Sequence, residues 1–131
     1  MASVKGVDPQ TLYPEVLETS VSACTLDVKL YISDQLCFFA GHFPEFAIVP
    51  GVIQVNWVVQ FARELLGLTA AVLNVEKLKF TCPIQPNMRV MLHVDVDFTK
   101  NSANFCFHSS ERESSPLIFS QGRLVYERVD E

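Results

Sequence analysis

Hydrophobic and polar residues alternate along two stretches of the chain, a pattern that is typical of strands with one buried face. In residues 24–32 every second side chain is apolar, and residues 88–98 repeat this alternation. Four less regular apolar segments are predicted to be further strands, over residues 16–21, 73–82, 103–107 and 117–129. The positions of the first stretch that should face the core are Cys24, Leu26, Val28, Leu30 and Ile32.

The spacing of apolar residues changes after Pro50. Residues 52–66 are nearly all apolar and contain no glycine or proline. At about 100° per residue, most of their polar side chains gather on one narrow face of a helix. These side chains are Asn56, Gln60, Arg63 and Glu64. A helix that is apolar around most of its circumference is predicted to be buried. Pro50 suits its first turn, and Gly67 suits its C-terminal cap.

The predicted order is two strands, one long helix and four strands. Short connections between strands favour an antiparallel sheet, and a single apolar helix must be covered by other elements. The pattern therefore predicts an α+β fold in which a curved antiparallel sheet wraps around one central helix. We expect a single domain over residues 1–131, with residues 1–14 as a loose lead-in because Pro9 and Pro14 interrupt regular structure.

Composition and charge narrow the class of protein. Hydrophobic residues make up 49% of the 131 residues and charged residues 19%, which indicates a folded chain with one core. The uncharged stretch 46–62 contains Pro50, Gly51 and three amides, so it is a poor membrane span. The N-terminus has no apolar core of signal-peptide length. We expect a soluble, cytoplasmic protein without a membrane partner. The net charge of −5 argues against a nucleic-acid partner.

The cysteines give no support for a metal site. None of the four forms a C-x-x-C pair, and all lie in apolar runs. They are Cys24, Cys37, Cys82 and Cys106. We expect them to behave as small buried hydrophobic residues, and we predict no bound metal.

His42 is the first candidate for chemistry. It lies on a proline-braced loop before the predicted helix, and histidine transfers protons well near neutral pH. Gly51 follows nine residues later, near the helix start, where backbone N–H groups lack internal acceptors and attract negative charge. A base and an oxyanion donor are what proton abstraction beside a thioester carbonyl requires. The alternative is an ordinary loop histidine followed by a Pro-Gly helix start.

Three segments carry a resemblance to a known family. G-H-F-P at 41–44, five further residues and then P-G-V at 50–52 resemble the beta-hydroxyacyl-acyl carrier protein dehydratases of the hotdog superfamily. Residues 78–86 are similar to that family's strand K-F-x-x-P-V-x-P-G-D, and residues 120–124 match on the last strand. The helix residues Gln54 and Trp57 are similar to those of the dehydratase-like subunit of aryl polyene biosynthesis clusters.

The resemblance implies a hotdog fold, a homodimer or higher homo-oligomer, and active sites at the subunit interface. It implies elimination of water from a 3-hydroxyacyl thioester to give the trans-2-enoyl thioester, in fatty acid or polyene synthesis. The acyl chain would be linked through phosphopantetheine to an acyl carrier protein. No metal, nucleotide or flavin cofactor is implied.

The resemblance also assigns roles to residues. His42 would remove the C2 proton, the Gly51 N–H would polarise the thioester carbonyl, and Asn56 occupies the position of the family's second catalytic group. Further residues are expected to bind the substrate: Phe43, Pro50, Val52, Gln54 and Trp57. For Gln54 two roles remain open, as a wall of the acyl tunnel or as a tie between the helix and a loop.

Asn56 is the main departure from the family, which has a glutamate or aspartate there. An amide can orient water but cannot deliver a proton as a carboxylic acid does, and such assistance contributes about 10²–10⁴-fold. Three functions therefore remain open: a slow dehydratase, a thioesterase in which Asn56 positions water, and a non-catalytic subunit that binds an acyl chain or carrier protein. Asn56 could also be a merely solvated or dimer-facing residue.

Overall fold

The protein folds as six strands and one long helix in the computed structural model, which describes residues 12–39, 47–109 and 117–128. The elements are β1 (Glu15–Val21), β2 (Thr25–Tyr31), the short 3-10 helix η2 (Cys37–Phe39), α1 (Gly51–Leu66), β3 (Val72–Phe80), β4 (Arg89–Asp97), β5 (Ser102–His108) and β6 (Ile118–Tyr126). Every predicted strand and the predicted helix are confirmed. The largest boundary errors are at the C-terminal ends of β3 and β6, which stop two and three residues before the predicted ends.

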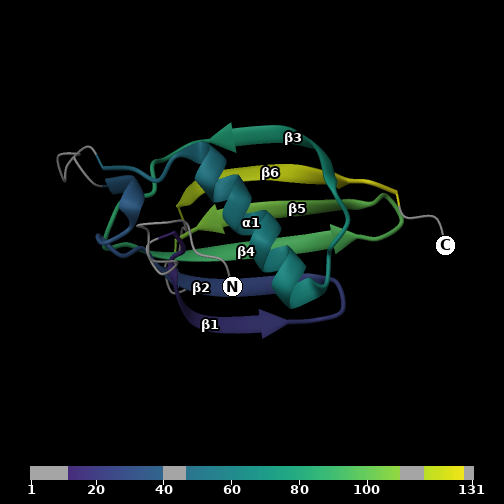
Figure 1. The fold of residues 1–131 in the computed structure, drawn as a ribbon, viewed down its shortest axis with the longest axis horizontal. Helices are drawn as coiled ribbons and strands as arrows, with labels where there is room; N and C mark the ends of the chain where they lie inside the picture. Colours follow the sequence, from purple (N-terminus) through teal and green to yellow (C-terminus); the bar gives the residue numbers. More distant parts are fainter. Residues whose placement is uncertain (1–11, 40–46, 110–116, 129–131) are drawn as a thin grey trace, which may run out of the picture.

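The strands form one antiparallel sheet in the order β1-β2-β4-β5-β6-β3. Figure 1 shows α1 lying obliquely across one face of this sheet, with β1 and β3 at the two edges. β3 follows the helix in sequence but lies at the edge opposite β1, where it pairs with β6. The three strands that come after β3 in sequence, β4, β5 and β6, lie between β2 and β3. The predicted architecture of one helix against an antiparallel sheet is confirmed.

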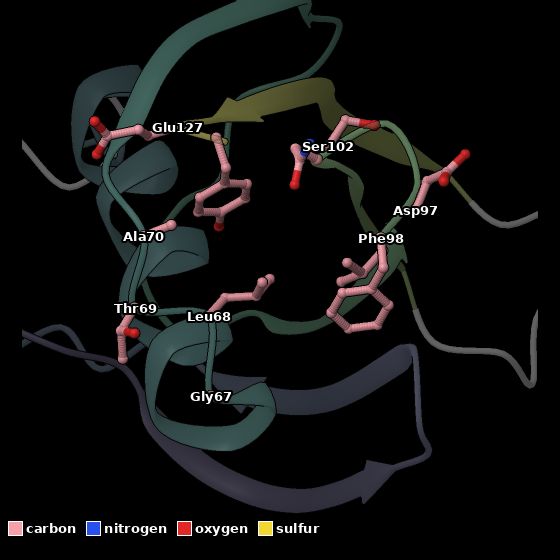
Figure 2. A pocket seen from close by; sticks show the side chains of 11 residues that line it. Gly67, Leu68, Thr69, Ala70, Asp97, Phe98, Ser102 and Glu127 are labelled. Atoms are coloured by element: carbon pink, nitrogen blue, oxygen red, sulfur yellow. The ribbon is translucent and has the colours of Figure 1, made fainter. Parts of the chain in front are cut away.

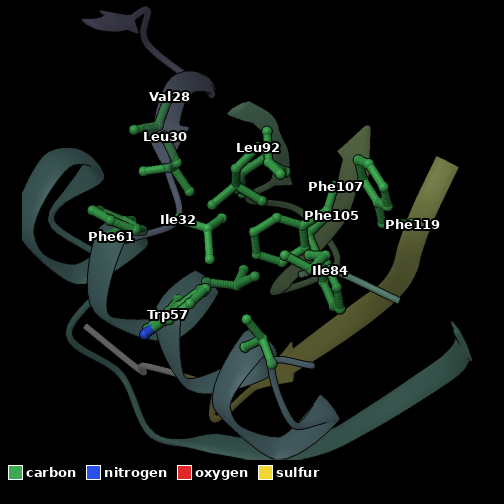
Figure 3. Close-up of a cluster of buried hydrophobic side chains, with 14 of the residues drawn as sticks. Val28, Leu30, Ile32, Trp57, Phe61, Ile84, Leu92, Phe105, Phe107 and Phe119 are labelled. Carbon is green, nitrogen blue, oxygen red and sulfur yellow. The ribbon is translucent and has the colours of Figure 1, made fainter. Parts of the chain in front are cut away.

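The core lies between the sheet and the inner face of α1. Alternate residues of β2 and β4 are buried, as their pattern predicts, and they pack in one cluster with Trp57 and Phe61 of the helix (Figure 3). The prediction of buried cysteines was wrong for Cys24 and Cys37, which are exposed. Cys24 lies just before β2, where the alternation of the sequence continues but the strand has not begun.

Both ends of α1 have the predicted signals. Pro50 precedes the first helical residue, and Gly67 closes the helix in the left-handed conformation at φ 70° with its N–H bound to the Ala62 carbonyl. The prediction of burial holds only for the face toward the sheet, because Val52 on the outer face is 75% exposed. Within the described residues, no helix has the length and apolar character to cross a membrane.

Candidate active site

The structure describes the predicted site only from Ala47 onward, so His42 and Phe43 lie outside the described residues. The segment that leads into α1 is fixed to the connection between β3 and β4. Ala47 and Val49 are buried, and the Val49 N–H donates to the Ile84 carbonyl at 2.8 Å. The residues that immediately precede α1 therefore have a defined position against the core.

The N-terminus of α1 presents free backbone donors. The Pro50 carbonyl accepts hydrogen bonds from the Ile53 N–H at 3.0 Å and the Gln54 N–H at 3.1 Å. In the part of the chain that the structure describes, the Gly51 and Val52 N–H groups have no acceptor. Unpaired N–H groups at the positive end of a helix dipole bind a negatively charged oxygen well.

Gly51 has no room for a side chain, because the Phe80 ring lies against it. A Cβ atom built at this position would be 2.5 Å from Phe80 Cζ, far inside van der Waals contact. Phe80 is the last residue of β3 and is 49% exposed, so its ring forms a wall beside the free N–H groups. Sequence reasoning did not assign Phe80 to the site. The K-F motif on β3 was the available signal.

Gln54 lies on the buried side of the helix, with 3% of its surface exposed. Its side-chain Nε2 donates to the Val49 carbonyl at 3.1 Å, and its Oε1 accepts from the Ser120 hydroxyl at 2.7 Å. A buried amide needs such partners, and here the protein supplies them at both ends. These contacts match the role of a tie between the helix and the preceding segment.

The remaining helix residues of the predicted site point in two directions. Asn56 is exposed on the same open face as Val52, four residues earlier. Trp57 is fully buried on the inner face, where its indole N–H donates to the Leu12 carbonyl at 3.0 Å. Its ring also meets Phe38 edge-on, with the centroids 6.3 Å apart. The helix therefore places Val52 and Asn56 on its exposed face and Trp57 on its buried face.

A cavity of about 210 Å³ lies at the other end of α1 (Figure 2). It is bounded by residues 67–70 after the helix, by Asp97 and Phe98 at the end of β4, and by Tyr126 of β6. A helix of 16 residues is about 24 Å long, so this cavity is far from Gly51. None of the described residues of the predicted site lines it. Burial raises the pKa of the Tyr126 phenol above its ordinary value.

His93 and His108 are half-buried. His93 Nδ1 lies 2.7 Å from the Asp27 carboxylate, across the β2–β4 pair on the outer face of the sheet. Among the residues that the structure describes, no three His, Cys, Asp or Glu side chains gather in a metal-binding group.

Known proteins resemble this chain in sequence and in fold. Residues 18–121 match the ApeI-like family, described as ApeI dehydratase. A relative from Novosphingobium aromaticivorans, the 3-hydroxyacyl-acyl-carrier-protein dehydratase FabZ, is 32% identical over 112 residues, covering 76% of this chain and 70% of its own length.

Two solved structures share the fold over most of the chain. The dehydratase heterocomplex ApeI:P from Xenorhabdus doucetiae superimposes with a TM-score of 0.78 at 27% identity, covering 88% of this chain and 99% of the matched one. An uncharacterized protein from Erwinia carotovora subsp. atroseptica gives a TM-score of 0.76 at 25% identity, covering 89% and 98%. The hotdog architecture and the resemblance to the aryl polyene subunit are confirmed by these matches. The chain belongs to the ApeI-like dehydratase family.

Proposed function

We propose that the protein is a hydro-lyase that removes water from a 3-hydroxyacyl thioester carried by an acyl carrier protein. The observation that carries this proposal is the pair of N–H groups at Gly51 and Val52 that have no acceptor among the described residues, nine and ten positions after His42. The substrate class is supported by the FabZ relative, which is named for 3-hydroxyacyl-acyl-carrier-protein. We expect the reaction to occur in the cytoplasm, in fatty acid or polyene synthesis.

The reaction needs one base and one oxyanion donor. His42 removes the C2 proton while the Gly51 N–H stabilises the negative charge that develops on the thioester oxygen. The C2 electron pair forms the C2=C3 double bond, and the C3–O bond breaks to release hydroxide. The hydroxide takes a proton and leaves as water. Asn56 can hold the leaving hydroxyl by a hydrogen bond but has no proton to give, so the proton comes from protonated His42 or from solvent.

A second hotdog chain is the proposed partner on the open side of the molecule. β3 is an edge strand, and Leu73 on it is 64% exposed. Phe80 at the other end of the same strand and Val52 on the helix are also exposed apolar residues. An unpaired strand edge beside exposed apolar side chains is a typical pairing surface. A homodimer through β3 would cover it, and the ApeI:P heterocomplex supports a hotdog chain as the occupant.

Leu73→Lys is expected to weaken this association by at least about tenfold in Kd, because a lysine in an apolar interface must lose its hydration. Light scattering at a series of concentrations measures the mass. Val21→Lys places the same charge on the opposite edge, where Val21 is equally an exposed residue of an edge strand, and should leave the mass unchanged. A monomeric wild type, or equal effects of the two variants, would rule out pairing through β3.

Asn56→Asp is expected to raise the rate of dehydration by about tenfold or more, since a carboxylic acid can deliver the proton that the amide cannot. The purified protein would be incubated with a 3-hydroxyacyl thioester, and enoyl absorbance and free thiol would be followed together. Enoyl product in the wild type that increases in Asn56→Asp supports the proposal.

The other outcomes contradict it in distinct ways. Free thiol without enoyl product identifies a thioesterase. Silence in both channels for the wild type and for Asn56→Asp identifies a subunit that binds an acyl chain or carrier protein without turnover.

A further inference from the structure

A polar connection runs through the apolar core from β6 to the start of α1. Ser120 is fully buried, and its hydroxyl donates to Gln54 Oε1, while Gln54 Nε2 donates to the Val49 carbonyl. Only a side chain with a donor at one site and an acceptor at another can make both bonds at once. A leucine in place of Gln54 would leave the Ser120 hydroxyl and the Val49 carbonyl without these partners.

Two paired residues of the sheet, Ser120 and Phe80, both contact the first turn of the helix. Ser120 pairs with Phe80 in the β3–β6 ladder, and the Phe80 ring lies against Gly51. The segment between these contacts is held on both sides, because the Val49 N–H donates to Ile84 and the Val49 carbonyl accepts from Gln54. Pro50 and Gly51 follow directly. The position of the Gly51 N–H relative to the sheet therefore depends on the Ser120–Gln54–Val49 connection.

We propose that Gln54, together with Ser120, is a positioning residue for the oxyanion donor at Gly51. The inference rests on the proposed function, in which the Gly51 N–H meets the thioester oxygen. The connection holds the Val49–Pro50 peptide against the sheet and so directs the next N–H at the substrate. The connection stabilises the transition state and not the bound substrate, because the charge on the thioester oxygen develops only in the transition state. Gln54 acts through Gly51 and does not touch the acyl chain.

Gln54→Leu and Ser120→Ala should each lower kcat by about 10–100-fold, since small displacements of an oxyanion donor have effects of this size. KM should stay within about threefold of the wild type, because binding of the carrier and acyl chain is not changed. Ser102→Ala is the matched control. Ser102 is also a buried serine, and its hydroxyl accepts from Arg123 at 3.2 Å, at the other end of the sheet. This control should lose stability without losing kcat.

The position of Gly51 can be measured without turnover. The chain has five glycines, so selective ¹⁵N-glycine labelling gives a simple amide spectrum. The Gly51 resonance should move in Gln54→Leu and in Ser120→Ala, and stay in place in Ser102→Ala. Gly67, at the far end of α1, should not respond to Ser120→Ala. If Gln54→Leu fails to fold, Ser120→Ala alone tests whether the connection positions the Gly51 N–H, since it removes one hydroxyl and leaves the helix sequence intact.

The two readouts separate failure of this inference from failure of the proposed function. An unmoved Gly51 resonance in Ser120→Ala overturns the inference, and so does a kcat loss no larger than that of Ser102→Ala. A wild type that forms no enoyl product refutes the dehydratase function instead, and the Gly51 resonance then decides alone whether the connection positions the N–H.

Discussion

His42→Ala is expected to reduce kcat for 3-hydroxyacyl thioester dehydration by about 10²–10⁴-fold, because it removes the base that takes the C2 proton. The other candidate groups cannot replace it. Asn56 is an amide, and the free N–H groups at Gly51 and Val52 stabilise charge without accepting a proton. The rate of enoyl formation, followed by absorbance at saturating thioester, measures the loss. The circular dichroism spectrum should be unchanged.

A second histidine provides the control. His93 lies on the outer face of the sheet beside Asp27, away from the helix N-terminus. His93→Ala should leave kcat within about threefold of the wild type. If His42→Ala behaved in the same way as this control, the base would have to be another group, and the assignment drawn from the G-H-F-P motif would be abandoned.

Trp57→Ala is expected to lower the free energy of unfolding by about 3–5 kcal/mol, the usual cost of emptying a large buried aromatic site. Trp57 is fully buried, meets Phe38 edge-on and donates to the Leu12 carbonyl, so the substitution removes packing and leaves that carbonyl without its donor. Thermal unfolding followed by circular dichroism should show a Tm lower by on the order of 10 °C.

Trp57→Phe separates the two contributions. It keeps an aromatic ring in the core but removes the N–H that binds Leu12, so a smaller loss of about 1–2 kcal/mol is expected. A loss in Trp57→Ala below about 1 kcal/mol would be too small for a fully buried indole and would contradict its placement in the core.

The secondary structure followed closely from the sequence because its strongest signals are local. Strict alternation defined β2 and β4, and Pro50 and Gly67 bounded α1. Local pattern was less reliable where it extended past an element, as at Cys24, which continues the alternation but is exposed. The helix face that carries Val52 was likewise predicted to be buried, because its residues are apolar. An apolar surface that a partner would cover has the same composition as one that the chain itself covers.

Only part of the candidate site could be predicted from the sequence, because some of its contacts join residues that are far apart in the chain. The spacing of His42 and Gly51 is visible in one segment. The contact of Ser120 with Gln54, and that of Phe80 with Gly51, require β3 to lie antiparallel beside β6, with the end of β3 and the start of β6 at the helix N-terminus. Alternation predicts that a segment is a strand but does not give its neighbour in the sheet. The amide of Gln54 therefore could be flagged as buried, but its partner could not be named.

The strand order also sets the order in which the sheet can be completed during synthesis. β3 has no neighbour in the sheet except β6, which is the last strand to be made. Until β6 docks, β3 has no strand to pair with, so the hydrogen-bonding groups of its backbone lack their sheet partners. Pairing across a long intervening chain is slow, because a large loop must close before any contact forms. The wall beside Gly51 is thus among the last parts of the molecule to assemble, and it is the part most dependent on protection from aggregation while the chain emerges.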